Sequence, residues 1–74
     1  MNRVNDWKNV LKYANKELNP KGYTIKVFKD EGYYSCVIVD KNNGNEEIDY
    51  AGGFREDELS NLITDAWHYA LSLK

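Results

Sequence analysis

The chain has 74 residues, of which 42% are hydrophobic and 30% are charged, with one cysteine and a net charge of −2 at pH 7. This balance is typical of a single globular domain and excludes a disordered chain, an internal disulfide and a cysteine-rich zinc site. The sequence has no apolar run of the roughly 18 residues that a membrane-spanning helix needs, and its first residues lack the apolar segment of a signal peptide. We therefore expect a cytoplasmic protein without membrane attachment.

The first predicted element is a helix over about residues 4–18. Its apolar residues recur every three or four positions and form one stripe, made of Val4, Trp7, Val10, Leu11, Ala14 and Leu18. Asn2 or Asn5 can cap its start by accepting a hydrogen bond from a free backbone N–H. The helix ends before Pro20, because the proline ring disfavours the helical conformation at Asn19.

Three segments rich in β-branched and aromatic residues follow, and they predict strands over about residues 23–29, 33–40 and 46–51. The tripeptide DEG (30–32) fits a three-residue hairpin loop, and the NG pair at 43–44 is a strong signal for a two-residue hairpin. Short loops of this kind join neighbouring antiparallel strands, so the sequence predicts a three-stranded meander.

The loop lengths also predict which side chains share a face of the sheet, because side chains alternate along a strand. The pairs across the hairpins would be Tyr23 with Val39, Ile25 with Val37, Val27 with Ser35, Val39 with Ile48, and Val37 with Tyr50. All of these side chains would face the helices. The opposite face, open to water, would carry Thr24, Lys26, Phe28, Tyr34, Cys36, Ile38, Glu47 and Asp49.

The stretch YAGGFREDEL (50–59) raises a choice between a phosphate-binding loop and a turn from a strand into a helix. A P-loop needs lysine and a hydroxyl residue after its last glycine, and neither is present. The three carboxylates at 56–58 would occupy the positive end of the helix dipole and would repel a phosphate. We therefore expect a turn at the two glycines, followed by a helix over about residues 55–73.

Together these elements predict one α+β domain over residues 1–74, in the order α-β-β-β-α. Both helices would pack on one face of the three-stranded antiparallel meander, because an apolar sheet face must be covered by a second layer. No further segment of the chain remains to cover the opposite face.

No set of residues in the sequence supports catalysis or metal binding. His68, the only histidine, falls on the outer side of the last predicted helix and has no neighbours that would complete a triad. Cys36 lies in the middle of a predicted strand beside Lys26, without a nearby base. The carboxylates lack the spacing of a calcium-binding loop. We expect no enzyme, no catalytic residues, no metal, no cofactor and no small-molecule substrate.

The net charge hides an asymmetry between the two halves of the chain. Residues 1–29 carry seven basic and two acidic side chains, a net charge of +5, whereas residues 30–74 carry three basic and ten acidic ones, a net charge of −7. Such an asymmetry can mark an interaction surface, although charges also simply solvate a small domain. The candidate acidic surface for a partner consists of Glu46, Glu47, Asp49, Glu56, Asp57 and Glu58.

The open face of the predicted sheet is the candidate protein-binding surface, formed by Phe28, Tyr34, Cys36 and Ile38. Phe28 and Tyr34 would be cross-strand neighbours, and an apolar pair of this kind either binds a partner or only stabilises the sheet. The candidate nucleic-acid surface is a set of lysines, Lys8, Lys12 and Lys16 on the first helix with Lys26 on the sheet.

In size and element order the chain resembles the double-stranded RNA-binding domain, and AWHYAL (66–71) looks like the alanine-rich last helix of that family. That family holds phosphates with lysines at the start of its last helix, where this chain has acids, so the resemblance implies the fold more than RNA binding. EGYYSCVIVD (31–40) is similar to the sheet of HicB-type antitoxins. Small acidic α-β-β-β-α proteins also occur among phage inhibitors of CRISPR nucleases.

These observations favour a non-catalytic binding protein that acts through protein–protein contacts. The partner would be another protein or a second copy of the chain. One concrete form is a phage- or mobile-element-type inhibitor whose acidic half meets a basic nucleic-acid enzyme. The alternative is a weak nucleic-acid-binding domain that uses the lysines, with Phe28 and Tyr34 stacking on bases. Nucleic acid is the less favoured partner because of the acids at 56–58.

Overall fold

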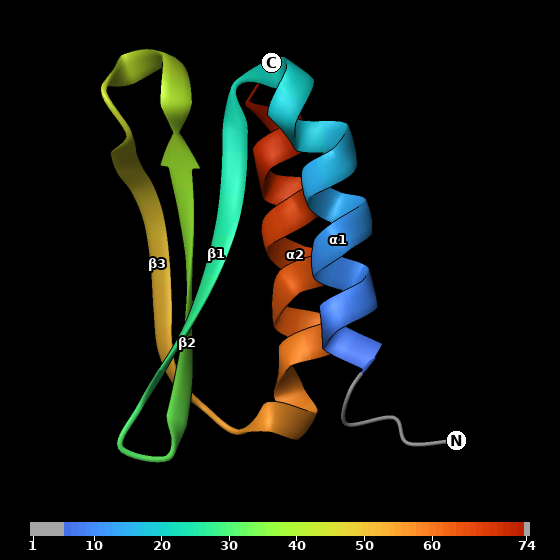
Figure 1. The fold of residues 1–74 in the computed structure, drawn as a ribbon, viewed down its shortest axis with the longest axis vertical. Helices are drawn as coiled ribbons and strands as arrows, with labels where there is room; N and C mark the ends of the chain where they lie inside the picture. Colours follow the sequence, from blue (N-terminus) through green and yellow to red (C-terminus); the bar gives the residue numbers. More distant parts are fainter. Residues whose placement is uncertain (1–5, 74) are drawn as a thin grey trace.

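The computed structural model describes residues 6–73, which form two helices and one sheet. In chain order the elements are α1 (Asp6–Leu18), β1 (Tyr23–Asp30), β2 (Tyr33–Asp40), β3 (Glu46–Phe54) and α2 (Leu59–Ser72). The strands form an antiparallel sheet in the order β1-β2-β3, and both helices lie on the same side of it (Figure 1). The predicted α+β class, element order and meander are therefore confirmed. The predicted start of the first helix at residue 4, its stripe residue Val4 and its caps Asn2 and Asn5 lie outside the described residues.

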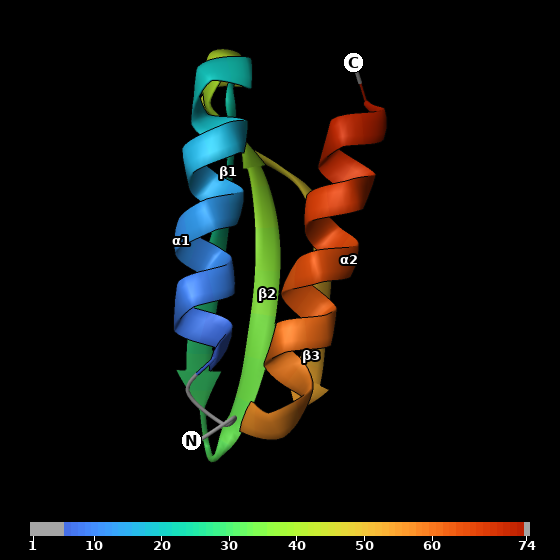
Figure 2. The same cartoon turned by 90° about the vertical axis from the view of Figure 1, so that its right-hand side faces the viewer.

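The two helices run in the same direction, side by side on one face of the sheet (Figure 2). At the end where both begin, the Trp7 indole donates a hydrogen bond of 3.0 Å to Glu56, in the 3₁₀ turn η4 (Glu56–Glu58) that leads into α2. At the opposite end the Trp67 indole donates one of 2.8 Å to Glu17. These two bonds join the helices near both ends. Neither helix within residues 6–73 has the length and apolar content to cross a membrane.

The core lies between the helices and the face of the sheet that they cover. Its buried members are Ala14, Leu18, Tyr23, Ile25, Cys36, Ile38, Leu59, Ile63, Ala66 and Ala70. Four of these come from α2 at positions 59, 63, 66 and 70, the spacing that places side chains on one side of a helix.

α1 also covers the outer edge of β1 at one point. The Asn15 amide donates a hydrogen bond of 3.0 Å to the carbonyl of Ile25, and its oxygen accepts one of 2.7 Å from the N–H of the same residue. Both backbone groups of Ile25 therefore point away from β2, which makes Ile25–Ile38 a non-hydrogen-bonded pair. Hydrogen-bonded and non-hydrogen-bonded pairs alternate along antiparallel strands. This one pair therefore also gives the direction in which the backbone N–H and C=O groups of β2 and β3 point.

The first hairpin differs from the predicted one by a single residue. Asp30 pairs with Tyr33, so the loop contains only Glu31 and Gly32. Both loop residues have positive φ, 52° and 85°, as a two-residue type I′ hairpin requires. A shift of one residue turns the other face of β2 toward the helices, because side chains alternate along a strand.

The predicted pairing of β1 with β2, and with it the predicted faces of β2, are consequently wrong. Ile25 pairs with Ile38, and Cys36 and Ile38 lie in the core, whereas Val37 and Val39 face away from the helices. All four β2 side chains are nonetheless buried. The helices cover one row of β2 side chains, and side chains of the flanking strands cover the other row. The free energy gained by burying these apolar side chains exceeds the cost of the positive φ at Glu31, about 1–2 kcal/mol.

The second hairpin confirms one predicted pair, Val37 with Tyr50. The other predicted pair is wrong, because a bulge between the partners of Ile38 and Val39 places Val39 opposite Glu47 instead of Ile48. The loop that joins the strands covers residues 41–45, so it is longer than the predicted two-residue turn.

The two glycines of the GGF stretch lie inside β3, and the predicted turn at this place is wrong. Ser35 pairs with Gly52 and Tyr34 with Phe54, so Gly53 is an extra residue in a second bulge. Its φ of 84° is strained for other residues and explains why glycine stands there. The strand therefore continues to Phe54, three residues beyond its predicted end.

Candidate functional site

The sheet face away from the helices carries three exposed aromatic side chains. Phe28, Tyr33 and Tyr50 are 51%, 57% and 65% exposed. Alternation along the strands places them on the same side as Val37 and Val39, which are only 2% and 4% exposed although no helix covers them. Side chains of the flanking strands shield these two valines. We call this surface, formed by Phe28, Tyr33, Val37, Val39 and Tyr50, the open face.

A close approach between Tyr50 and Gly52 shapes one side of the open face. A Cβ atom added to Gly52 would lie 2.5 Å from the Tyr50 hydroxyl oxygen and 3.0 Å from the ring carbon that carries it. The hydroxyl end of the phenol ring therefore lies over Gly52, on the strand itself. A side chain at this position would displace the exposed ring from the strand.

Of the four residues predicted for a protein-binding face, Phe28 lies on it and the other three do not. Tyr34 is half-buried on the helix side, with its ring centroid 6.0 Å from that of Trp7. Cys36 and Ile38 are 3% and 1% exposed and belong to the core. Their predicted exposure was wrong because the hairpin loop is one residue shorter than expected.

Cys36 and His68, the cysteine and the histidine of this chain, lie in different environments. Cys36 pairs with Val27, so its predicted neighbour Lys26 is not beside it in the register. Burial raises the pKa of the Cys36 thiol to about 11, and the negative charge of Asp49 adds to the effect. The thiol is therefore protonated at neutral pH and is a poor nucleophile. His68, by contrast, is exposed on α2.

The predicted acidic residues do not gather into one surface. Glu46 and Glu47 begin β3, whereas Glu56, Asp57 and Glu58 follow its other end, roughly 25–30 Å away along an extended strand. The second group is also engaged within the molecule. Glu56 accepts the Trp7 bond, Glu58 accepts a 2.8 Å bond from the backbone N–H of Arg55, and the Arg55 side chain lies 3.5 Å from Asp57.

The predicted basic residues are divided between two sides of the molecule. Lys8, Lys12 and Lys16 are exposed at a spacing of four residues on α1, which places them in one row. Lys26 is exposed on the sheet, on the side of Phe28 and away from the helices. The structure therefore brings together three of the four lysines.

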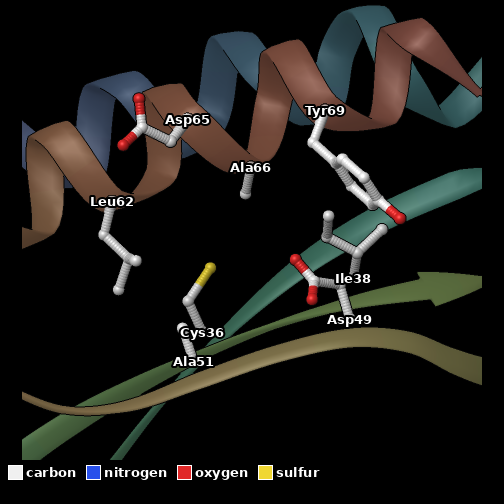
Figure 3. A pocket seen from close by; sticks show the side chains of 8 residues that line it. All are labelled: Cys36, Ile38, Asp49, Ala51, Leu62, Asp65, Ala66 and Tyr69. Carbon is white, nitrogen blue, oxygen red and sulfur yellow. The ribbon is translucent and has the colours of Figure 1, made fainter.

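A groove of about 210 Å³ lies between α2 and β3. It is lined by Cys36, Ile38, Asp49, Ala51, Leu62, Asp65, Ala66 and Tyr69. Figure 3 shows Leu62, Ala66 and Tyr69 directed from α2 toward the sheet, and the Cys36 sulfur directed from β2 toward α2. The groove exists because the side chains at positions 51 and 66 are small where helix and strand face each other.

Sequence reasoning missed Tyr33 and Tyr50 on the open face, and it missed Asp65 and Tyr69 at the groove. Tyr33 and Tyr50 would have been placed on the open face if Glu31-Gly32 had been taken as a two-residue loop. That loop length reverses which side chains of β2 face the helices. Nothing in the sequence signals the second pair, because the groove depends on how far α2 stands from β3. Within residues 6–73 no three histidine, cysteine or acidic side chains cluster as metal ligands.

The fold and these surfaces define a small α+β domain with an uncovered aromatic sheet face and an acidic groove between a helix and an edge strand. Comparison of the chain with protein-family models, curated proteins and solved structures finds no match.

Proposed function

We propose that this domain is a non-catalytic protein-binding module that uses its open face. The observation that carries the proposal is the combination of exposed aromatics with a buried aliphatic floor. Tyr50 pairs with Val37, and Phe28 and Tyr33 follow toward the first hairpin on the same face, which neither α1 nor α2 covers. Aromatic side chains around an aliphatic centre are typical of the central part of protein interfaces, where they contribute large areas at low entropic cost.

The size of the open face sets the expected strength of binding. The spacing of the strands and the rise per residue give the face roughly 400 Å². Stable complexes bury about 800 Å² on each partner, so a flat contact through this face alone supports a transient complex. A second copy of the chain docked face to face would be held weakly for the same reason.

The test compares binding by three forms of the protein. Phe28→Ser combined with Tyr50→Ser removes two of the aromatics without opening a cavity in the core, because both side chains are at least half exposed. Tyr13→Ser is the matched control, since Tyr13 is 59% exposed but lies on α1. Each form is immobilised, exposed to an extract of the native cell, and analysed by quantitative mass spectrometry.

The expected result is a protein retained by the wild type and by Tyr13→Ser and lost by the double variant. Amide NMR spectra establish that all three forms are folded. Equal retention by the three folded forms would contradict the use of the open face.

A narrower version takes the partner to be a basic nucleic-acid enzyme and the domain to be an inhibitor from a phage or mobile element. It is supported by the exposed carboxylate of Glu47, which pairs with Val39 on the open face, and by the exposed Glu46 beside it at the start of β3. This version predicts that the retained protein is basic and that Glu46→Gln with Glu47→Gln weakens its capture at low salt.

Nucleic-acid binding is the second candidate, supported by the exposed row of Lys8, Lys12 and Lys16 on α1. Binding through lysines releases counterions from the nucleic acid, so the affinity should fall steeply with salt. Gel shifts with single- and double-stranded RNA and DNA at low salt test this candidate. The absence of any shift would dismiss it, and binding unaffected by changing the three lysines to glutamine would place it on another surface.

A further inference from the structure

β3 is an edge strand with backbone groups directed outward. Ile25 is bonded to Asn15 on its outer side, so the backbone groups of Ile38, its partner, point toward β3. Ile38 pairs in turn with Asp49, whose own groups therefore point back toward β2. Alternation then directs the N–H and C=O groups of Tyr50 and Gly52 away from the sheet. Among residues 6–73 no backbone bond from a turn, loop or cap reaches these groups.

The regular part of this edge is short. One bulge in the pairing of β3 with β2 comes just before Asp49 and the other just after Gly52. The pairing is therefore regular between these two residues. Bulges hinder the addition of a long strand at an edge. The four residues 49–52 are therefore the segment that a further strand can pair with.

The groove lies directly beside this segment. Asp49 and Ala51 line it from β3, with their side chains on the helix side of the sheet, and Asp65 and Tyr69 line it from α2. A strand added outside β3 would direct alternate side chains to that same side, at the mouth of the groove. Addition of an extended peptide to a sheet edge beside a side-chain pocket is a recurring mode of peptide recognition.

The lining of the groove favours a long cationic side chain. Its charged groups are the carboxylates of Asp49 and Asp65, and no basic side chain of residues 6–73 lines it. Figure 3 shows the Asp49 carboxylate within the groove and the Asp65 carboxylate directed away from the sheet, at the rim. The apolar lining residues suit the methylene stem of lysine or arginine, whose charged head would lie at the carboxylates. The volume of about 210 Å³ exceeds the roughly 150 Å³ of a cavity that holds benzene, so such a stem fits.

We infer that the edge of β3 binds an extended peptide segment of another protein, which adds as a fourth strand and places a lysine or arginine side chain in the groove. Main-chain bonds would form at Tyr50 and Gly52, and charge complementarity with Asp49 and Asp65 would select the basic side chain. The groove lies on a different surface from the open face, so either surface can bind while the other does not.

A second copy of the chain is a poor occupant of this edge. A partner β3 would bring its own Asp49 toward Asp49 and Asp65 of the first copy, and like charges on neighbouring strands repel each other. A partner β1 would meet the Asn15 side chain that already occupies the backbone groups of Ile25. The peptide is therefore expected from a different protein.

The test is an amide NMR titration of the whole chain with a capped pentapeptide, Thr-Val-Lys-Val-Thr. Two matched peptides carry norleucine or glutamate in place of the lysine. The lysine peptide should shift the signals of residues 49–52 and of the α2 residues that line the groove, with a dissociation constant of about 1 mM for so short a contact. Exchange of the Tyr50 and Gly52 amide hydrogens should slow in its presence, because new main-chain bonds protect them.

Protein variants separate the charge from the backbone contact. Asp49→Asn with Asp65→Asn should weaken binding of the lysine peptide by about tenfold and make it equal to that of the norleucine peptide. Asp30→Asn is the matched control, because it removes an exposed carboxylate from a side chain that pairs with Tyr33 on β2, away from the groove. This control should bind as the wild type does, and the glutamate peptide should not bind.

Four results would overturn the inference. They are no saturable shift with the lysine peptide, shifts confined to Phe28 and Val37 on the open face, equal binding of the lysine and norleucine peptides by the wild type, and a dimer in sedimentation whose Tyr50 and Gly52 amides are protected without peptide. None of these depends on the lysate test of the open face, so the two surfaces are judged separately.

Discussion

Asn15 binds both backbone groups of Ile25, with a donated bond of 3.0 Å and an accepted bond of 2.7 Å. An asparagine amide thus takes the place of a neighbouring strand at the outer edge of β1. The two edges of the sheet are unequal as a result, because the corresponding groups of Tyr50 and Gly52 on β3 have no such cover within residues 6–73. Edge strands left uncovered are sites where further strands add.

Replacement of Asn15 with alanine should destabilise the protein by about 1–3 kcal/mol, because two part-buried backbone groups lose their partner. Urea unfolding followed by circular dichroism measures the change. Asn9→Ala is the control, since Asn9 is exposed on the same helix and has no side-chain bond within the described residues. Equal stability of the two variants would show that Asn15 contributes little.

Glu31→Asn should stabilise the protein by about 0.5–1 kcal/mol. Glu31 has a φ of 52°, and asparagine followed by glycine is the preferred pair for a two-residue type I′ hairpin. The measurement is the midpoint of thermal unfolding. Glu31→Ala removes the same carboxylate but keeps the strained φ, so it should give no such gain. A similar gain from alanine would attribute the effect to the charge instead of the backbone.

The Cys36 thiol should make the stability depend on pH at the alkaline end. Burial, with a contribution from Asp49, raises its pKa from 9.0 to about 11, so the folded protein keeps the proton to a higher pH than the unfolded chain. The stabilising contribution is complete below pH 9.0 and is lost as the pH rises toward about 11. Because the thiol lines the groove, solvent screens part of this effect, and we expect a loss of about 1–2 kcal/mol.

The measurement is the difference in unfolding free energy between wild type and Cys36→Ala from pH 8 to about 11, the upper limit being the raised pKa. Lysines, tyrosines and the groove residues Asp49, Asp65 and Tyr69 are present in both proteins, so the difference isolates the thiol. A difference that does not change with pH would contradict the raised pKa.

Ala51→Leu should fill part of the groove and stabilise the protein by about 0.5–1.5 kcal/mol, because the larger side chain packs against the apolar lining from α2. The same variant should no longer bind the lysine pentapeptide. Gly53→Ala is the contrasting change on the same strand, and it should destabilise by about 1–2 kcal/mol because the φ of 84° at Gly53 is strained for alanine. Loss of stability in Ala51→Leu would mean that the groove cannot accommodate a side chain.

The amino-acid sequence by itself determined the number, type and order of the elements. Apolar residues at helical spacing, alternating β-formers and turn residues are local signals, and each predicted segment overlaps a helix or strand of the same type. The α+β class followed, because a three-stranded apolar face needs a covering layer and the two helices are the segments that supply it.

Only the tertiary structure decided which residues share a face. Asp30-Glu31-Gly32 is compatible with a loop of three or of two residues, and the two differ by one step in register. The choice depends on the burial of Cys36 and Ile38 under helices that are distant in sequence, which outweighs a local strain at Glu31. The groove likewise depends on the distance between α2 and β3, which is set by contacts between segments far apart in the sequence. The sequence therefore determined the elements through local interactions, and long-range packing decided the binding surfaces.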